Sequence, residues 1–217
     1  MNKSMYSLIL SDDVIDKIDS RAKLMNLSRS GLINQILAEY VGYVTPEAQR
    51  AEIYNAIIEA LDKDENFKKM SPSETAVTYF SSLPYKYNPS VRYTVEIFEI
   101  GDYIRGEIRA GLRSQSSSLL YNFAEFFSRW TALEQGRSPR HKSAFVNGRF
   151  IRPFVFENTG DSAAAGESLA EYIQTVDRSM KAYFRYLDNT NTAYRHMEDI
   201  LNDFLRAVES ESWFLKG

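Results

Sequence analysis

The hydrophobic period of the chain changes from two residues to about four within the first 45 residues, and this change limits the folds open to it. Residues 5–10 read Met-Tyr-Ser-Leu-Ile-Leu, with apolar side chains at alternate positions. This alternation predicts a short strand with one apolar face, formed by Tyr6, Leu8 and Leu10. A single short strand leaves its backbone donors and acceptors unpaired, so it must find a second strand elsewhere.

Two helices are predicted after this strand. Ser11 is a typical N-cap for the first helix, and acidic residues follow it. Asn26 stands where the C-terminal end of a helix often takes the left-handed conformation, which Asn tolerates. Ser28 opens the second helix, which Gly42 and the Thr45-Pro46 pair end. Its apolar positions predict a wide buried face, made of Leu32, Ile33, Ile36, Leu37, Tyr40 and Val41.

The order strand, helix, short turn, helix over about forty residues resembles the ribbon-helix-helix (Arc/MetJ-type) family of DNA-binding repressors. The residues that carry the resemblance are Tyr-Ser-Leu-Ile-Leu-Ser at 6–11, the helix over 12–25, and Asn-Leu-Ser-Arg-Ser-Gly-Leu-Ile at 26–33. The resemblance covers residues 3–44. It implies that two chains pair their strands antiparallel, and that the resulting ribbon lies in the major groove of double-stranded DNA.

The resemblance also assigns roles to six residues. Met5, Ser7 and Ile9 would face the bases, although only Ser7 is a good hydrogen-bonding reader and the other two can only contact thymine methyl groups. Ser28, Arg29 and Ser30 would anchor the DNA backbone. They lie at the start of a helix, where free N–H groups and the positive dipole end suit a phosphate.

Charge and pattern leave a simpler alternative open for these residues, a helical hairpin in which Ser28 is only an N-cap. The first 44 residues hold five basic and five acidic residues, so they are neutral. The whole chain has a formal net charge of -3. Binding to non-specific DNA is therefore expected to be modest.

The remaining residues predict an α-helix-rich α+β domain over 45–217, following a domain over 1–44. Helical spacing predicts four helices, around 53–61, 119–133, 169–184 and 194–208. Alternation predicts a strand over 91–97, residues 71–90 read as a connection, and residues 135–165 are rich in turn signals that include Asn147-Gly148. The segment 101–113 fits either period, and its three glycines favour a hairpin over a helix. The expected fold class is thus mainly α with short β.

Two further patterns stay open in this part of the chain. A helical form of 101–113 would make residues 91–133 a second ribbon-helix-helix-like unit. The stretch 105–152 is the most basic part of the sequence, and it predicts either extra phosphate contacts, an acidic effector site or a solvated face paired with acidic neighbours.

Several classes of protein are disfavoured. The chain has no Cys, which excludes disulfides and thiolate sites, and only His141 and His196 are available to a multi-histidine metal site. No phosphate-binding glycine loop or nucleophile elbow is present. We therefore expect no enzyme activity, no catalytic residue, no metal site and no cofactor. No apolar run is long enough for a membrane span or a signal peptide, which predicts a cytoplasmic protein without a membrane partner.

The sequence thus predicts a sequence-specific DNA-binding transcriptional regulator, a repressor that acts as a homodimer or a higher homo-oligomer. The C-terminal domain would serve oligomerisation or bind an effector or a protein partner. The alternative is an antitoxin-like or mobile-element accessory protein, whose C-terminal domain binds a protein partner.

Overall fold

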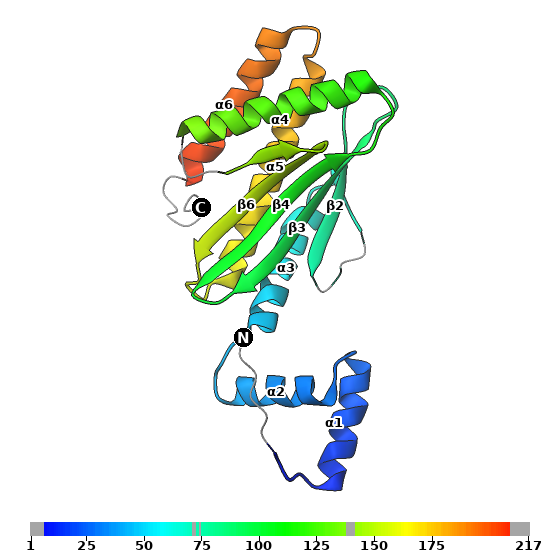
Figure 1. The fold of residues 1–217 in the computed structure, drawn as a ribbon, viewed down its shortest axis with the longest axis vertical. Helices are drawn as coiled ribbons and strands as arrows, with labels where there is room; N and C mark the ends of the chain where they lie inside the picture. Colours follow the sequence, from blue (N-terminus) through cyan, green and yellow to red (C-terminus); the bar gives the residue numbers. More distant parts are fainter. Residues whose placement is uncertain (1–6, 71–72, 74, 138–141, 209–217) are drawn as a thin grey trace. The chain divides into compact units, whose positions relative to one another are not determined.

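The structure is a computed structural model that describes residues 7–70, 73, 75–137 and 142–208. Within these residues it has six helices and one six-stranded antiparallel sheet, so the fold is α+β. The chain divides into two compact units, residues 1–48 and 49–217 (Figure 1).

The N-terminal unit contains the two helices that the sequence predicts, α1 (Asp12–Leu24) and α2 (Arg29–Tyr40). Asn26 follows α1 with φ of 54°, and the N–H of Leu27 donates to the carbonyl of Ala22 at 2.8 Å. Gly42 ends α2 in the same way, with φ of 70°. These left-handed residues close each helix because they return the chain to the last free carbonyls.

The described part of the predicted N-terminal strand does not form a strand in the single chain. Met5 and Tyr6 lie outside the described residues, and residues 7–10 belong to no strand. The physical reason is that an isolated strand has no partner for its backbone groups.

The C-terminal unit is built on a sheet with strand order β1-β2-β3-β4-β6-β5. Its strands are β1 (Phe67–Lys69), β2 (Ala76–Ser82), β3 (Ser90–Ile100), β4 (Tyr103–Leu112), β5 (Ala144–Val146) and β6 (Arg149–Glu157). Its helices are α3 (Pro46–Asp62), which begins at the end of the N-terminal unit, α4 (Ser117–Arg137), α5 (Ser162–Arg185) and α6 (Thr190–Val208).

The four predicted helices and the strand over 91–97 are confirmed. The segment 101–113 is not a hairpin by itself but contains one strand, β4, which pairs with β3. The connection predicted over 71–90 is wrong, because this segment contains β2 in the interior of the sheet. The turn at Asn147-Gly148 joins β5 to β6, and both residues have positive φ. Residues 103–112 form a strand that pairs with β3 and with β6, so the helical alternative for this segment is wrong. The second ribbon-helix-helix-like unit over 91–133 required that helix and is therefore wrong as well.

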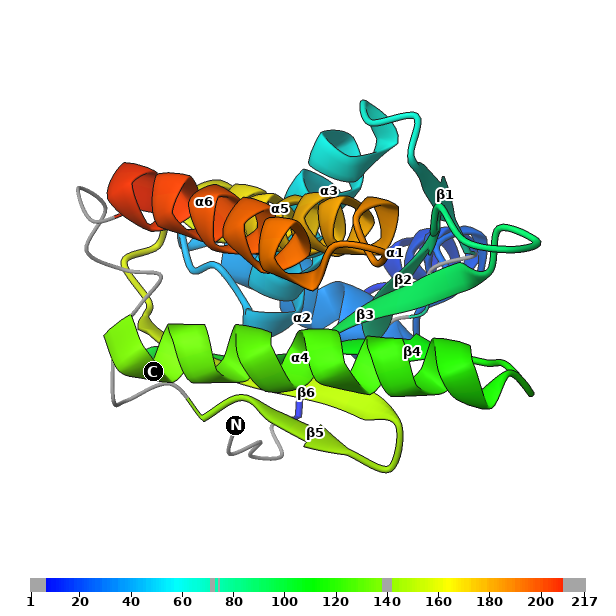
Figure 2. The ribbon, with the colours of Figure 1, turned by 90° about the horizontal axis from the view of Figure 1, so that it is seen from above.

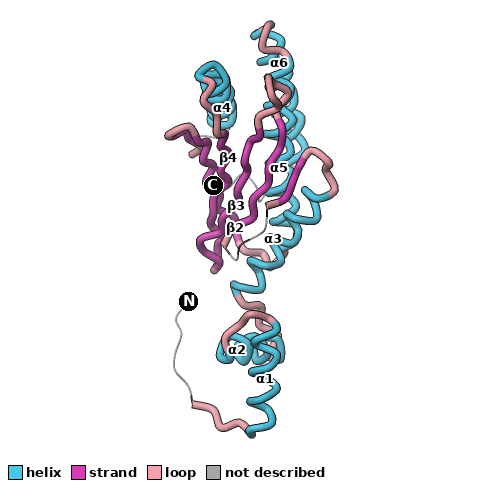
Figure 3. Tube along the Cα trace, turned by 90° about the vertical axis from the view of Figure 1, so that its right-hand side faces the viewer, coloured by secondary structure: helices cyan, strands magenta, loops and turns pink. Residues whose placement is uncertain are grey.

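One face of the sheet carries the core. Buried residues alternate along the strands, for example Val91, Tyr93 and Val95 on β3, and they face the helices. Helices α3, α5 and α6 all lie on this side of the strands (Figure 3). Seen from above, α4 lies between the β5–β6 hairpin and the paired helices α5 and α6 (Figure 2), and Phe127 of α4 stacks on Phe150 at 4.3 Å between ring centroids. No described helix of this unit covers the opposite face.

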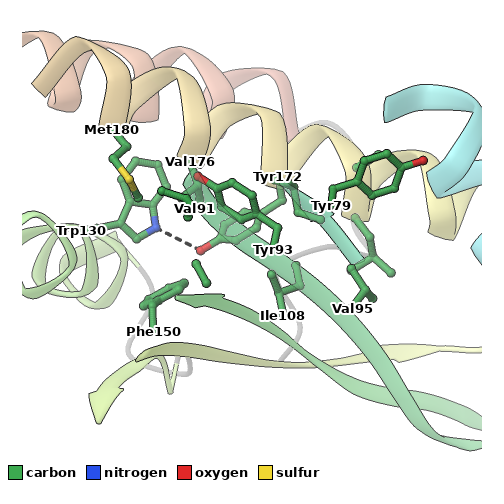
Figure 4. Packing of buried hydrophobic residues seen from close by; sticks show 14 of the residues in the cluster. Tyr79, Val91, Tyr93, Val95, Ile108, Trp130, Phe150, Tyr172, Val176 and Met180 are labelled. Atoms are coloured by element: carbon green, nitrogen blue, oxygen red, sulfur yellow. Dashed lines mark hydrogen bonds between the residues drawn. The ribbon is translucent and has the colours of Figure 1, made fainter. Parts of the chain in front are cut away.

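A polar network crosses the centre of this core. The Trp130 Nε1–H donates to the Tyr172 hydroxyl at 3.0 Å (Figure 4), and that hydroxyl donates to Glu134 at 2.8 Å. Glu134 also pairs with Arg152 at 3.4 Å, and both side chains are only 2% exposed. Burial raises the pKa of Tyr172, which keeps its hydroxyl a neutral donor. Four residues from α4, α5 and β6 are thereby held in one geometry.

Candidate nucleic-acid interface

The start of α2 brings together the three residues that the sequence analysis assigns to phosphate contact. Ser28 is the N-cap, and its Oγ accepts from the N–H of Gly31 at 3.1 Å. The Ser28 and Ser30 hydroxyls lie 3.3 Å apart. The first N–H groups of a helix have no partner within the helix, so those of Arg29 and Ser30 are available to an anion. A Cβ at residue 31 would lie 3.1 Å from the Ser28 hydroxyl, so glycine there leaves room for the cap.

Arg29 is held by Asp19, a partner that no sequence pattern indicates. Its Nε–H donates to Asp19 Oδ1 at 2.6 Å, and its second guanidinium nitrogen pairs with the other carboxylate oxygen. The hydrogen bond from Arg29 lowers the pKa of Asp19, and the same bond raises the pKa of Arg29. Both side chains remain largely exposed. Asp19 therefore holds the guanidinium beside the start of α2, where any incoming phosphate must compete with the Asp19 carboxylate for this cation.

The pairing of Arg29 with Asp19 follows from the turn between the helices. Asp19 is in the second half of α1 and Arg29 opens α2, ten positions later. The left-handed Asn26 reverses the chain between them and brings the two side chains together. A helical pattern alone does not reveal this pairing, because it lacks the geometry of the turn.

The residues assigned to base reading lie in a segment that the single chain leaves exposed. Ser7 and Ile9 are both exposed, and Met5 lies outside the described residues. The structure therefore brings Ser28, Arg29 and Ser30 together but shows no ribbon that would place Ser7 and Ile9 on one reading face.

The apolar face predicted for α2 is mostly exposed in the single chain, which corrects the expected burial. Only Leu32 of that set is buried. The others recur at intervals of three and four residues and continue past the helix, which makes an apolar stripe along its surface. This α2 stripe consists of Ile33, Ile36, Leu37, Tyr40, Val41 and Val44, of which Ile33 is half-buried and the rest exposed.

The C-terminal unit offers a weaker candidate, a cavity of about 180 Å³ between α4, α5 and α6. It is smaller than the roughly 300–1,000 Å³ of pockets for drug-sized ligands. At its wall Glu125 accepts hydrogen bonds from Tyr194 at 3.0 Å and from Arg129 at 2.8 Å. The guanidinium of Arg129 lies 3.4 Å from the centroid of the Tyr194 ring. These polar groups satisfy one another, so the cavity presents little free chemistry to an effector.

The basic stretch over 105–152 is divided by the fold. Arg105 pairs with Glu99, Arg109 pairs with Glu96 and Glu107, and Arg152 is buried. Exposed ion pairs thus account for Arg105, Arg109 and Arg129, and core structure accounts for Arg152. Arg113 and Arg149 make no ion pair within the described chain.

The described residues offer neither a metal site nor a membrane span. They contain no group of three or more His, Cys, Asp or Glu side chains that could hold a metal ion. Among the described helices, none combines the length and apolar character that crossing a bilayer requires.

Comparison with known proteins adds no functional assignment. The chain matches no protein-family model, no curated protein and no solved structure.

Proposed function

We propose that the protein is a sequence-specific regulator that binds double-stranded DNA as a homodimer through its N-terminal unit. One observation carries the proposal: this unit is incomplete as a single chain. Both the segment Ser7–Leu10 and the α2 stripe are exposed, although their patterns are those of a strand and a buried helix face. A second copy would supply the missing strand and cover the stripe, because both features are self-complementary in a two-fold dimer.

In such a dimer the paired strands form a ribbon that fits the major groove. Ser7 reads a base edge, Met5 and Ile9 contact thymine methyl groups, and these contacts set the sequence preference. Ser28, Arg29 and Ser30 bind phosphates on either side and fix the register of the ribbon on the duplex. The single anchoring arginine and the neutral charge of the unit predict a strong dependence on these few contacts.

The regulatory role is part of the same proposal. A dimer bound at a promoter would act as a repressor because it blocks access to the DNA. The C-terminal unit would set the oligomeric state or receive a partner.

An electrophoretic mobility shift with the DNA upstream of the protein's own gene tests the proposal. Arg29→Ala should weaken binding to all sequences about tenfold and reduce the salt dependence, whereas Ser7→Ala should change the preference among sequences. Arg206→Ala is the matched control, because this arginine is exposed on α6 and far from the N-terminal unit in sequence. Unchanged binding after deletion of residues 1–44 would show that the proposed interface is wrong.

A further inference from the structure

The sheet of the C-terminal unit has an open face on which the strand register aligns residues that are distant in sequence. Lys68 pairs with Phe80, Phe80 with Arg92, Arg92 with Gly111, and Gly111 with Arg149. We call this set the cross-strand row. It runs across five neighbouring strands, from β1 to β6.

The side chains of the row point away from the core. Their neighbours in sequence, Phe67, Val91, Leu112 and Phe150, are buried on the helix-covered face. Successive side chains of a strand point to opposite faces, so the row lies on the face that no described helix of the unit covers (Figure 3). Lys68, Arg92 and Arg149 are exposed accordingly, and Phe80 is half-buried between the first two.

The cations of the row differ from the other arginines of this face. Arg105 and Arg109 are neutralised by glutamates. In contrast, Lys68, Arg92 and Arg149 form no salt bridge with any described residue, and the row itself contains no acidic residue. One end of the open face is therefore cationic and the rest is neutralised.

The spacing and the residue types suit a single nucleic-acid strand. The three cations stand on alternate strands, which places their backbones about 9–10 Å apart, twice the spacing of adjacent strands. An aromatic ring lies in the first interval, and Gly111 leaves the second interval without a side chain. Proteins bind single strands by combining phosphate-binding cations with aromatic rings on which bases stack. A duplex cannot use the ring in this way, because its bases are already paired and stacked on one another.

We propose that the cross-strand row binds single-stranded nucleic acid, with phosphates at Lys68, Arg92 and Arg149 and a base stacked on Phe80. This surface belongs to the C-terminal unit, whereas the start of α2 belongs to the N-terminal unit. It therefore does not depend on the DNA-binding role of the N-terminal unit.

Fluorescence anisotropy of the full-length protein tests the proposal. The probes are labelled oligo-dT and oligo-U of about 20 nucleotides, and a duplex of the same length. The triple variant Lys68→Ala/Arg92→Ala/Arg149→Ala should bind both single strands at least about tenfold more weakly, and its salt slope should fall by about 2 for three lost phosphate contacts. Phe80→Leu should weaken binding at least about fivefold while it keeps the side chain apolar.

Two controls separate this surface from the N-terminal one. Arg105→Ala removes an ion-paired cation from the same face and should leave single-strand binding unchanged. Arg29→Ala should weaken binding to the duplex alone. Thermal melting by circular dichroism establishes that each variant is folded.

The proposal is overturned if the triple variant binds the single strands as tightly as Arg105→Ala does. It is equally overturned if the wild-type protein prefers the duplex and that preference is lost in the triple variant, since the row would then be a duplex-binding surface. A loss of single-strand binding in Arg29→Ala, with none in the triple variant, would assign the activity to the N-terminal unit.

Discussion

The two units of this protein differ in how much of their apolar surface they bury. In the N-terminal unit Ala22, Leu32 and Ala38 are the only described apolar side chains that are fully buried. In the C-terminal unit the strands and four helices enclose one continuous cluster, which includes Trp130 and Phe127 with no exposed surface at all. The second unit has the core of an independent domain, whereas the first leaves most of its apolar side chains exposed.

Ion pairs show the same difference. Arg29 and Asp19 meet on an exposed surface, where water and salt weaken their attraction. Arg152 and Glu134 meet in the interior, where the loss of either partner would leave a buried charge. The exposed pair can therefore exchange one partner for a ligand at little cost, and the buried pair cannot. The exposed pair therefore suits an exchangeable contact, whereas the buried pair suits a rigid core.

The largest expected effect is on the free energy of dimerisation, from a substitution in the exposed α2 stripe. Leu37→Glu places a charge in the middle of the α2 stripe. Burial of one leucine contributes about 1.5–3 kcal/mol, and a two-fold dimer loses two of them, so dimerisation should weaken by about 3–6 kcal/mol. Sedimentation equilibrium measures this change as a shift from dimer to monomer.

Asn34→Glu adds the same charge to an exposed polar position of α2 and should leave the dimer intact. If Leu37→Glu were to remain dimeric as well, the α2 stripe would not be the interface, and the C-terminal unit would have to hold the dimer together.

The next largest effect is expected on the free energy of unfolding of the C-terminal unit. Trp130→Ala removes the largest fully buried side chain and leaves the Tyr172 hydroxyl without its indole donor. The free energy of unfolding should fall by about 3–5 kcal/mol, as measured by urea denaturation followed by circular dichroism. Tyr121→Ala on the same helix removes an exposed ring and should change it by less than about 1 kcal/mol. Equal midpoints for the two variants would contradict the description of this core.

The sequence predicts an element of these two units where a local pattern specifies it, and misses the element where distant residues specify it. Helices α1, α2, α5 and α6 are predicted because period and caps are local properties, as with Ser28 and Asn26. Strand β2 is missed because its buried positions, Val77 to Tyr79, do not alternate, and because Ser and Pro residues on both sides resemble a connection. The glycines of β4 correctly indicate a strand, and Gly106 shows why. A Cβ there would lie 2.5 Å from the Phe154 ring on the neighbouring strand.

The candidate sites differ in the same way, because some consist of residues adjacent in sequence and others of residues that the fold brings together. The anion site at the start of α2 is predicted because its residues are adjacent in sequence. The Arg29–Asp19 pair requires the geometry of the turn, and the cross-strand row requires the register of five strands. Neither is present in any local pattern. The ribbon remains a prediction, because it needs a second chain.

Loss of the N-cap of α2 should have a smaller effect on stability and on duplex binding. Ser28→Ala removes the oxygen that accepts from the N–H of Gly31, which costs a helix about 1 kcal/mol. The thermal transition of the N-terminal unit should move down, and duplex binding should weaken by less than it does in Arg29→Ala. Ser28→Asn restores an accepting group and should recover most of the loss. A Ser28→Ala variant with unchanged melting but lost DNA binding would mean that this hydroxyl contacts the phosphate and is not primarily a cap.

The smallest effect has the opposite sign and tests the competition between Asp19 and DNA for one arginine. Asp19→Asn removes the carboxylate that holds Arg29 and also removes a negative charge near the proposed phosphate position. Duplex binding should become about two- to fivefold tighter at low salt, and the gain should shrink as salt screens the charges. Glu39→Gln makes the same change of charge near the far end of α2 and should have less effect. If Asp19→Asn binds DNA more weakly, the carboxylate holds Arg29 in its binding position and does not compete with DNA for it.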